Sequence, residues 1–563
     1  MHELVIRGGT VVDGTGAPAF VADVAVADGT ITEIGHVDGR GARELDADGL
    51  VVAPGWVDIH THYDGQVTWD PELTPSSWHG VTTVVMGNCG VGFAPVRPDG
   101  QAFLIELMEG VEDIPGTALH EGIDWDWESF PEYLDALDKT PRAIDVAAQV
   151  PHAALRAYVM GERAHDRDST AEEIAEMSRL AEEALRAGAC GVSTSQTILH
   201  SSKHGLVPGT HAMPEELIAL GEAVGRAGHG VFQLISDHQG GAADREWLVD
   251  LVDRTGITAT YTLAQAGHAP EAWRDAIAAS DGDAAVGRRI IPQVANRPTG
   301  MLFGLQSSLH PFFTHPTYRR LADLPLEARV AALRQADVRA ALVAEQPQTR
   351  NPIALGLMQR WGQMFPLGDT PDYEPPASAS VAAVAAREGR EPQDVVLDWL
   401  LEQDGRAFLF APLASYVDHN LDVLQEMMVN PNTVLGLSDG GAHCGLICDV
   451  SMPTYLLTHW VNGRTRGERL GLELAISLQT SRTASAYGFT DRGILAPGKR
   501  ADVNLIDLEG MELHAPEMVC DLPAGGRRLI QRASGYVATL VAGDVTFEHG
   551  EPTGVRPGRL VRF

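Results

Sequence analysis

The chain of 563 residues has few cysteines, few lysines and no long hydrophobic run. Its five cysteines are scattered and odd in number, which argues against a disulfide framework and favours a reducing cytoplasm. No apolar stretch approaches the roughly 20 residues that span a membrane. The N-terminal MHELVIRGGTVVDG has no basic segment followed by an apolar one, so we expect no secretion signal.

Positive charge is also scarce. The sequence has 76 acidic residues against 42 lysines and arginines, and its net charge is −34. Such a surface repels nucleic acid and anionic membranes, so we expect neither as a partner. The expected partner is a small-molecule substrate, and a homo-oligomer is left open. Only Lys139, Lys203 and Lys499 are lysines, which limits lysine-based chemistry.

Both ends of the chain have the pattern of short β-strands. Residues 1–54 contain LVIRGGTVV and DVAVADGTITEIG, and residues 480–563 contain RADVNLIDL and YVATLVAGDVTFEHG. Glycine and Asp-Gly turns separate these runs, as in hairpins. A chain of this length is expected to form more than one unit. We therefore predict one small β-sandwich domain built from residues 1–54 and 480–563.

The middle of the chain, residues 55–479, alternates apolar runs with helical patterns. The clearest helix is STAEEIAEMSRLAEEALRAGA, with Ser169 as the expected N-cap and Glu172 and Glu173 in the first turn. The alternation predicts the α/β class and a (β/α)8 TIM-like barrel. The predicted strands are GWVDIHTH, GVTTVVMGNCG, AIDVAAQVPH, GACGVSTSQT, GVFQLISD, GITATYTLA, RRIIPQVAN and NTVLGLSDGG.

Two segments do not fit a simple barrel. An extra apolar run, RAFLFAPLAS, leaves the strand count open. Residues from about 300 to 380 break the alternation and are rich in Phe, Met, Trp and Pro. We interpret them as an insert, either a lid over the barrel mouth or a structural excursion.

Residues that bind metals stand at the ends of the predicted strands, where barrels place their active sites. His60 and His62 end the first strand, and their spacing of two points both side chains to the same side. Cys89 follows the second strand in MGNCG, and Asp439 ends the last strand in GLSDGG. Two imidazoles, a thiol and a carboxylate that converge in this way predict a metal site.

The sequence resembles the amidohydrolase superfamily, and within it the D-aminoacylase, or N-acyl-D-amino-acid deacylase, branch. The resemblance implies a barrel capped by a β-sandwich from both chain ends, and zinc beside the His-x-His pair. It also implies that Cys89 takes the place of the carbamylated lysine of many amidohydrolases. It rests on GLVVAPGWVDIHTHYDGQ, GVTTVVMGNCGVGFAPV, RAYVMGERA, EEALRAGACGVSTS, GLSDG, DRGILAPGKRADVNLIDL and TGVRPGRLVRF.

The sequence departs from the family pattern at strands five and six, where the resemblance implies one metal-binding histidine each. Ile235 or Ser236 stands at the first position and Leu263 at the second. His238 and His268 follow these positions and are candidate replacement ligands, unless they are loop histidines without a metal role. We therefore expect one Zn²⁺, or another divalent metal, rather than two, held by His60, His62 and Asp439. Cys89 is a further candidate ligand unless it is a small buried core residue, and a site without metal is left open.

The resemblance also assigns Asp439 the role of general base, which takes a proton from metal-activated water and returns it to the leaving amine. His443, four residues later, is a second catalytic candidate, for the substrate carbonyl or for orienting Asp439. His152, after the third strand, and Arg297, after the seventh, are candidates for substrate binding. His79 precedes the second strand and is expected to be structural.

These residues predict a metal-dependent hydrolase of a C–N amide bond. The resemblance favours an N-acyl amino acid or a related amide as substrate, with a cyclic amide or a lactone as the alternative. The missing histidines leave a different class open, a non-catalytic relative that binds a small ligand. No Gly-x-Ser-x-Gly elbow is present, which argues against a serine hydrolase.

Overall fold

The computed structural model describes residues 2–349, 351–436 and 438–563. Eight parallel strands lie side by side in chain order, and they are the eight predicted runs. The extra run RAFLFAPLAS contains β17 (Leu409–Pro412), which belongs to a separate antiparallel sheet. The barrel strands are β6 (Trp56–Asp58), β7 (Val81–Met86), β8 (Asp145–Pro151), β9 (Gly191–Gln196), β12 (Val231–Ser236), β13 (Thr258–Thr262), β14 (Ile290–Val294) and β18 (Val434–Leu435).

Backbone contacts just beyond the strand ends join the last strand to the first. A parallel bridge links Thr61 to Gly440, and the Gly440 carbonyl accepts from the His62 N–H at 2.7 Å. The Asp439 N–H donates to the His60 carbonyl at 3.1 Å. These bonds close the ring at its carboxyl end, and they bring two predicted site segments into direct contact.

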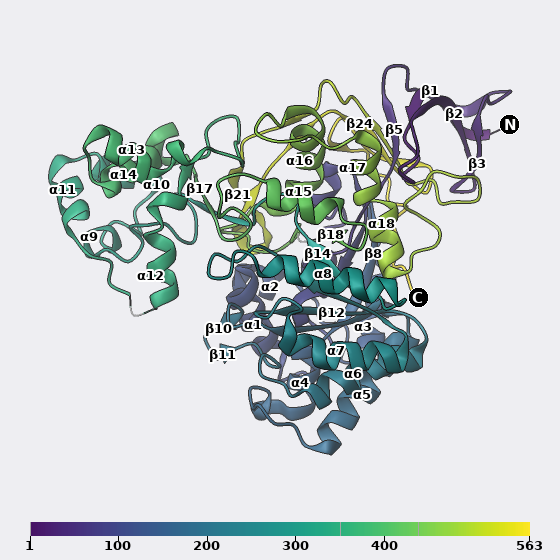
Figure 1. Cartoon of the computed structure of the whole chain (residues 1–563), viewed down its shortest axis with the longest axis horizontal. Helices are drawn as coiled ribbons and strands as arrows, with labels where there is room; N and C mark the ends of the chain where they lie inside the picture. Colours follow the sequence, from purple (N-terminus) through teal and green to yellow (C-terminus); the bar gives the residue numbers. More distant parts are fainter. Residues whose placement is uncertain (1, 350, 437) are drawn as a thin grey trace.

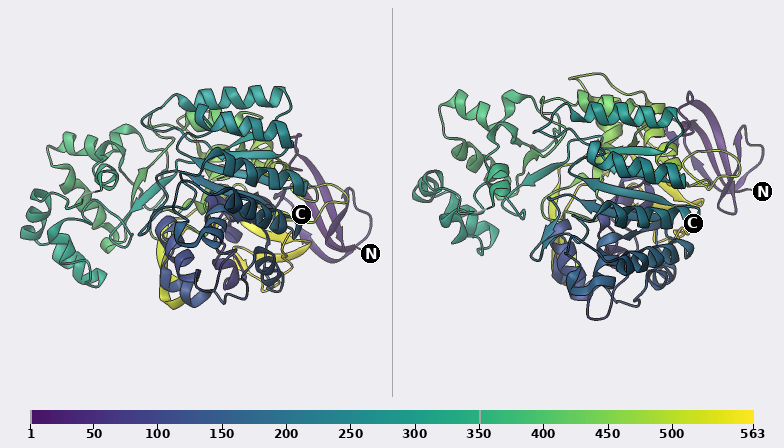
Figure 2. Two further views of the ribbon diagram at one scale, coloured as in Figure 1. Left: turned by 90° about the horizontal axis from the view of Figure 1, so that it is seen from below. Right: turned by 60° about the horizontal axis from the view of Figure 1, so that its bottom comes forward.

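Helices surround the barrel strands (Figures 1 and 2). The helix after the third strand has its N-cap at Thr170, whose hydroxyl accepts from the Glu173 N–H at 3.2 Å in a capping box. The predicted cap at Ser169 is therefore wrong by one residue. The helices are α1 (Gln101–Glu112), α2 (Gly116–Gly122), α3 (Phe130–Asp138), α4 (His152–Met160), α5 (Ala171–Arg186), α6 (Pro214–Ala227), α7 (Ala242–Thr255), α8 (Ala272–Ala285) and α15 (Asp422–Val429).

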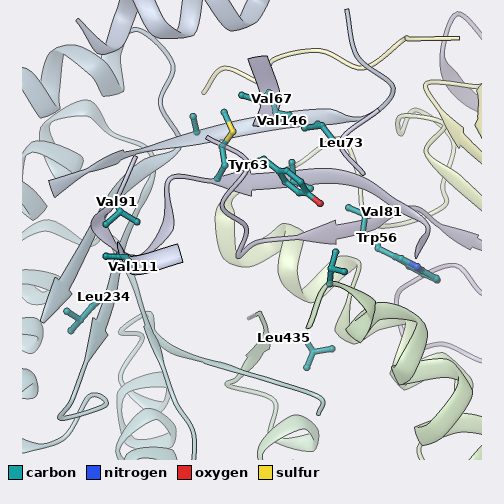
Figure 3. Close-up of a cluster of buried hydrophobic side chains, with 14 of the residues drawn as sticks. Trp56, Tyr63, Val67, Leu73, Val81, Val91, Val111, Val146, Leu234 and Leu435 are labelled. Atoms are coloured by element: carbon teal, nitrogen blue, oxygen red, sulfur yellow. The ribbon is translucent and has the colours of Figure 1, made fainter. Parts of the chain in front are cut away.

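Apolar side chains hold this frame together. Figure 3 shows part of the main core, in which Val81, Val146 and Leu234 come from three barrel strands. Each is fully buried, and burying one such side chain contributes about 1.5–3 kcal/mol. The strand ends are therefore carried on a rigid scaffold, as precise placement of a site requires.

A second sheet combines both ends of the chain. Strand β5 (Val51–Pro54) pairs antiparallel with β19 (Val503–Ile506), so N-terminal and C-terminal strands share one nine-stranded sheet. The predicted fold class, a barrel with a β-domain from both ends, is confirmed. The other strands are β1 (His2–Val11), β2 (Phe20–Ala27), β3 (Thr30–Gly35), β4 (Gly41–Asp46), β24 (Tyr536–Val541), β25 (Asp544–Glu548) and β26 (Glu551–Pro552).

Between β14 and β18 the chain forms a lobe at the opposite end of the molecule from β1–β3 (Figures 1 and 2). The lobe has its own apolar core, which includes Leu333, Val396 and Leu409. The expected insert boundary near residue 380 falls at the start of α13, inside this lobe. Its elements are β15 (Gly300–Phe303), α9 (Pro316–Arg319), α10 (Leu326–Leu333), α11 (Ala336–Ala344), α12 (Pro352–Met358), β16 (Phe365–Pro366), α13 (Val381–Glu388), α14 (Pro392–Leu400) and β17.

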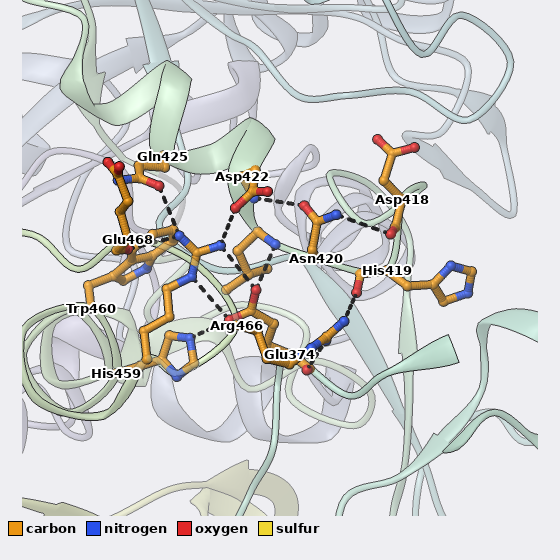
Figure 4. Close-up of polar contacts among 12 residues, drawn as sticks. Glu374, Asp418, His419, Asn420, Asp422, Gln425, His459, Trp460, Arg466 and Glu468 are labelled. Carbon is orange, nitrogen blue, oxygen red and sulfur yellow. Dashed lines mark hydrogen bonds and ion pairs between the residues drawn. The ribbon is translucent and has the colours of Figure 1, made fainter. Parts of the chain in front are cut away.

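Two attachments tie the lobe and its connecting segment to the barrel. The Leu302 N–H donates to the Leu446 carbonyl at 2.7 Å, in the loop that follows β18. In the connecting segment, the Glu374 carboxylate accepts from the Arg464 guanidinium at 3.1 and 3.2 Å and from His459 at 2.9 Å (Figure 4). Glu374 is 2% exposed and Arg464 is 1% exposed, so this is a buried ion pair.

None of the described helices is both long and apolar enough to cross a membrane. All five cysteines are free thiols, and all except Cys520 are buried.

Candidate metal centre and active site

Four side chains from strands one, two and eight converge at the carboxyl end of the barrel. The Nε2 atom of His60 lies 3.2 Å from the Sγ atom of Cys89 and 3.5 Å from Oδ1 of Asp439. The Nε2 atom of His62 lies 3.6 Å from the same carboxylate oxygen. Donor atoms of His60, His62 and Cys89 all lie within 4.8 Å of one another. The structure thus brings together the four residues that were predicted to bind metal.

The donor types and their spacing fit a zinc ion. Zinc bonds of about 2.0–2.3 Å in a tetrahedral arrangement correspond to donor-to-donor distances of about 3.3–3.8 Å. The three measured distances that involve Nε2 atoms are 3.2, 3.5 and 3.6 Å. Imidazole, thiolate and carboxylate are also the ligand types that zinc takes in proteins.

The turn after β7 fixes the cysteine. Gly87 has φ of +78°, and a Cβ atom there would lie 2.4 Å from the Gln149 carbonyl oxygen, so only glycine fits. Cys89 itself adopts φ of +55°, and its N–H donates to Oε1 of Gln233 at 2.9 Å. The Asn88 amide donates to the Val85 carbonyl at 2.9 Å. The sequence MGNCG therefore forms a tight turn that holds the thiol over the barrel.

Partners on the far side of each ring orient the two histidines. The Nδ1 atom of His60 lies 2.8 Å from Oε1 of Gln293, which can only accept a hydrogen bond. Nδ1 therefore carries the proton, and the Nε2 lone pair faces Cys89 and Asp439. The Nδ1 atom of His62 lies 3.4 Å from Oε1 of Glu112. Such outer partners are typical of histidines that bind metal.

Burial and charge set the protonation of these groups. Burial lowers the pKa of His60 to about 4 and raises the pKa of the Cys89 thiol to about 11. Burial alone would raise the pKa of Asp439, but its close contact with His62 and the charges of the nearby histidines hold that pKa well below its ordinary value. At neutral pH the cluster therefore presents a neutral His60 and an ionised Asp439, and metal binding must release the thiol proton.

The second predicted catalytic residue, His443, lies at the edge of this cluster. Its Nε2 atom is 3.5 Å from Oε2 of Glu112, and 24% of its side chain is exposed. Asp439 lines a small cavity together with Gly441 and Cys444. Of the two predicted catalytic residues, Asp439 lines this cavity and His443 is partly exposed.

The candidates for substrate binding lie elsewhere. His152 is fully buried, with its ring nitrogens 2.8 Å from Thr194 Oγ1 and 2.6 Å from Glu216 Oε1. Arg297 is 1% exposed, forms an ion pair with Asp449 at 2.9 Å and packs on the Tyr373 ring. The structure therefore places both among buried protein partners, and a role of either residue in substrate binding stays a prediction. His79 is also buried and has partners on both nitrogens, consistent with a structural role.

The two candidate replacement ligands do not reach the cluster. His238 and His268 are exposed on the loops after β12 and β13, and neither belongs to a metal-binding group among the described residues. Leu263 is buried, and Ser236 donates to Asp244 at 3.1 Å. Their loops carry both histidines outward to solvent, which favours the alternative that they are loop histidines without a metal role.

Sequence reasoning missed two residues of the site, Glu112 and His200. Glu112 is 1% exposed at the end of α1, four residues beyond the buried Met108 and directly after the buried Val111. A carboxylate on the buried stripe of an amphipathic helix was the available signal. His200 follows the fourth strand, and its Nδ1 atom lies 3.1 Å from Ser195 Oγ. Burial, then the charges of His443 and His62, lower the pKa of His200 to about 3.

Comparisons with known proteins agree with this site. Residues 43–547 match the model of the amidohydrolase family. The D-aminoacylase of Alcaligenes xylosoxydans xylosoxydans is 29% identical over 568 residues, which cover 99% of this chain and 97% of the relative. The N-acyl-D-aspartate deacylase of the same organism is 28% identical, with 99% of this chain and 95% of the relative covered.

Solved structures show the same architecture. A crystal structure of D-aminoacylase superposes with a TM-score of 0.66 at 23% identity, with both chains fully covered. The N-acyl-D-glutamate deacylase of Bordetella bronchiseptica, complexed with zinc and a phosphonate inhibitor, superposes with a TM-score of 0.65 at 25% identity over the full length of both chains. The chain therefore belongs to the amidohydrolase family. It is a hydrolase that acts on C–N amide bonds.

Proposed function

We propose that this protein hydrolyses the amide bond of N-acyl amino acids, with a preference for the D configuration. The convergence of His60, His62, Cys89 and Asp439 on one point carries the proposal, since this donor set fits zinc. Full-length similarity to deacylases of N-acyl-D-amino acids supports the substrate class.

The chemistry divides between the metal and the chain. Bound zinc would lower the pKa of water and polarise the substrate carbonyl. Asp439 is ionised and lines the cavity, so it accepts the proton of the attacking water and delivers it to the leaving amine. His443, at the edge of the cluster, donates a hydrogen bond to the substrate carbonyl oxygen as negative charge develops there.

We further propose one zinc ion per chain. Strands five and six offer Ile235, Ser236 and Leu263 near the expected ligand positions, and the loop histidines that follow are exposed. Lys203 forms an ion pair with Glu106 at 2.6 Å and its side chain is 64% exposed, which leaves Cys89 rather than a lysine as the candidate ligand. A cytoplasmic location and a homo-oligomeric state stay predictions.

A panel of substrates tests the proposal. Zinc-loaded protein is incubated with matched N-acetyl-D- and N-acetyl-L-amino acids, and the released amine is measured. We expect turnover of D substrates that stops when a chelator removes zinc and returns when zinc is restored. The same assay with a hydantoin and a lactone covers the alternative substrates. Zinc-loaded protein that cleaves none of the N-acyl amino acids would refute the substrate class.

A further inference from the structure

We propose that Glu112 is a positioning residue that holds His62 for metal binding and couples it to His443. The inference rests on the proposed metal site and extends it to a residue outside the ligand set. Glu112 ends α1, and its carboxylate is the one described group that lies within ion-pair distance of both histidines.

The carboxylate is placed between two rings. Oε1 lies 3.4 Å from Nδ1 of His62, and Oε2 lies 3.5 Å from Nε2 of His443. No other basic side chain of the described residues pairs with Glu112 within 4.0 Å. Each oxygen therefore faces a different histidine, one in the predicted ligand set and one, His443, that is partly exposed.

Glu112 acts through His62 rather than as a ligand beside it. It faces Nδ1, whereas Asp439 lies 3.6 Å from Nε2, on the other side of the ring. An acceptor at Nδ1 keeps the proton there and leaves the Nε2 lone pair directed at the ligand cluster. His60 has the same arrangement with a neutral partner, Gln293, at 2.8 Å.

The burial of Glu112 points to a role beyond folding. The residue is 1% exposed, and neither carboxylate oxygen has a hydrogen-bond donor among the described residues. Leaving a buried polar group without a hydrogen bond costs about 1–3 kcal/mol, and more for a charged group. Such exceptions in folded proteins call for an explanation, and a metal bound at Nε2 of His62 would supply one, because it would fix the ring proton on Nδ1, which faces Oε1 of Glu112.

The end of α1 also supplies a matched control. The His443 N–H donates to the Glu112 backbone carbonyl, so a substitution of the side chain leaves this bond in place. The next residue, Asp113, accepts from the Gly445 N–H and from Ser308 Oγ, both at 3.1 Å. Asp113 thus anchors the same loop with a carboxylate that contacts neither histidine. A substitution of Asp113 therefore shows how much of an effect comes from loosening this loop alone.

The test compares Glu112→Gln with Asp113→Asn in the full chain. Zinc is removed, and the affinity for added zinc is measured by competition with a chromophoric chelator. We expect E112Q to lose about 10–100-fold in zinc affinity and D113N to keep the wild-type value. Glu112→Asp, which retains the charge, should recover part of the loss. Equal zinc affinity of E112Q and the wild type would overturn the proposal.

A second measurement needs no variant. Nitrogen-15 NMR of the zinc-loaded wild-type protein reports which ring nitrogen of His62 carries hydrogen. We expect a protonated Nδ1 and a metal-bound Nε2, and the opposite tautomer would exclude Glu112 as the positioning group. Because neither experiment uses a substrate, a failure of the proposed deacylase activity does not affect them.

Discussion

The Nε2 atom of His60 lies 3.2 Å from the Sγ atom of Cys89, although 28 residues separate the two in the chain. The first ends strand one and the second follows strand two, and neighbouring parallel strands bring their carboxyl ends together. A buried imidazole and a buried thiol at this distance form one side of the proposed metal site, which Asp439 and His62 would complete.

Cys89→Ser is expected to lose most of the bound zinc, because a hydroxyl is a much poorer zinc ligand than a thiolate. Elemental analysis of purified protein should give about one zinc per wild-type chain, by the ligand count of the site. Cys190→Ser is the matched control, since Cys190 is equally buried but outside the cluster. Retention of zinc in C89S together with loss in C190S would contradict the assignment.

Asp439→Asn removes the proposed proton acceptor. We expect kcat to fall by about 10²–10⁴-fold, the typical contribution of general acid–base catalysis. The pH dependence of kcat/KM should also lose its acidic limb. Asp418→Asn is a control on an exposed carboxylate and should leave both unchanged. An unaltered pH profile in D439N would assign the proton transfer to another group.

His238→Ala and His268→Ala should leave zinc content and activity unchanged. Both side chains are exposed and outside the ligand cluster, and substitutions at such positions usually change stability by less than about 0.5 kcal/mol. Zinc analysis and initial rates of the double variant provide the check. A loss of zinc in this variant would show that the loops fold inward when metal binds.

Glu374→Gln should destabilise the protein by about 3–5 kcal/mol, because it removes the buried carboxylate that pairs with Arg464 and leaves that guanidinium only the exposed carboxylate of Asp422. Glu388→Gln, at an exposed position, should have almost no effect on the melting temperature. Equal melting temperatures for the two variants would show that the buried pair contributes nothing net.

The same carboxylate predicts an acid sensitivity. Burial alone would raise the pKa of Glu374, but hydrogen bonds from His459 and Arg464 lower it from the ordinary 4.5 to about 2. Since the folded-state pKa is depressed, its stabilisation is complete above pH 4.5 and is lost as the pH falls toward 2. Unfolding measured by circular dichroism should show a shallower acid decline in E374Q than in the wild type.

Much of the architecture follows from local pattern. All eight predicted barrel strands are present. Each is a short apolar run between turn residues and helices, and this pattern can be recognised in the sequence without knowledge of tertiary contacts. The N-cap of α5 is Thr170 rather than the predicted Ser169, because two adjacent hydroxyl residues can both fill this position. The extent of the insert was missed, since its later helices resemble those of the barrel.

The site residues also fall into those that the sequence predicts and those that it does not. His60, His62, Cys89 and Asp439 could be found because strand ends meet at one face of a barrel. His238 and His268 could not be placed, since sequence distance from a strand says nothing about the path of its loop. Glu112 was missed because it lies on a helix, where a single carboxylate among apolar residues is an ambiguous signal.

The pairing of β5 with β19 determines when the terminal sheet can fold during synthesis. The two strands are separated by about 450 residues, so at about 5–20 residues per second the ribosome needs roughly 20–90 s to supply the partner. During that interval the N-terminal strands present an unpaired edge. Chaperone binding to the nascent chain, or premature truncation near the C-terminus, should therefore act first on this sheet rather than on the catalytic barrel.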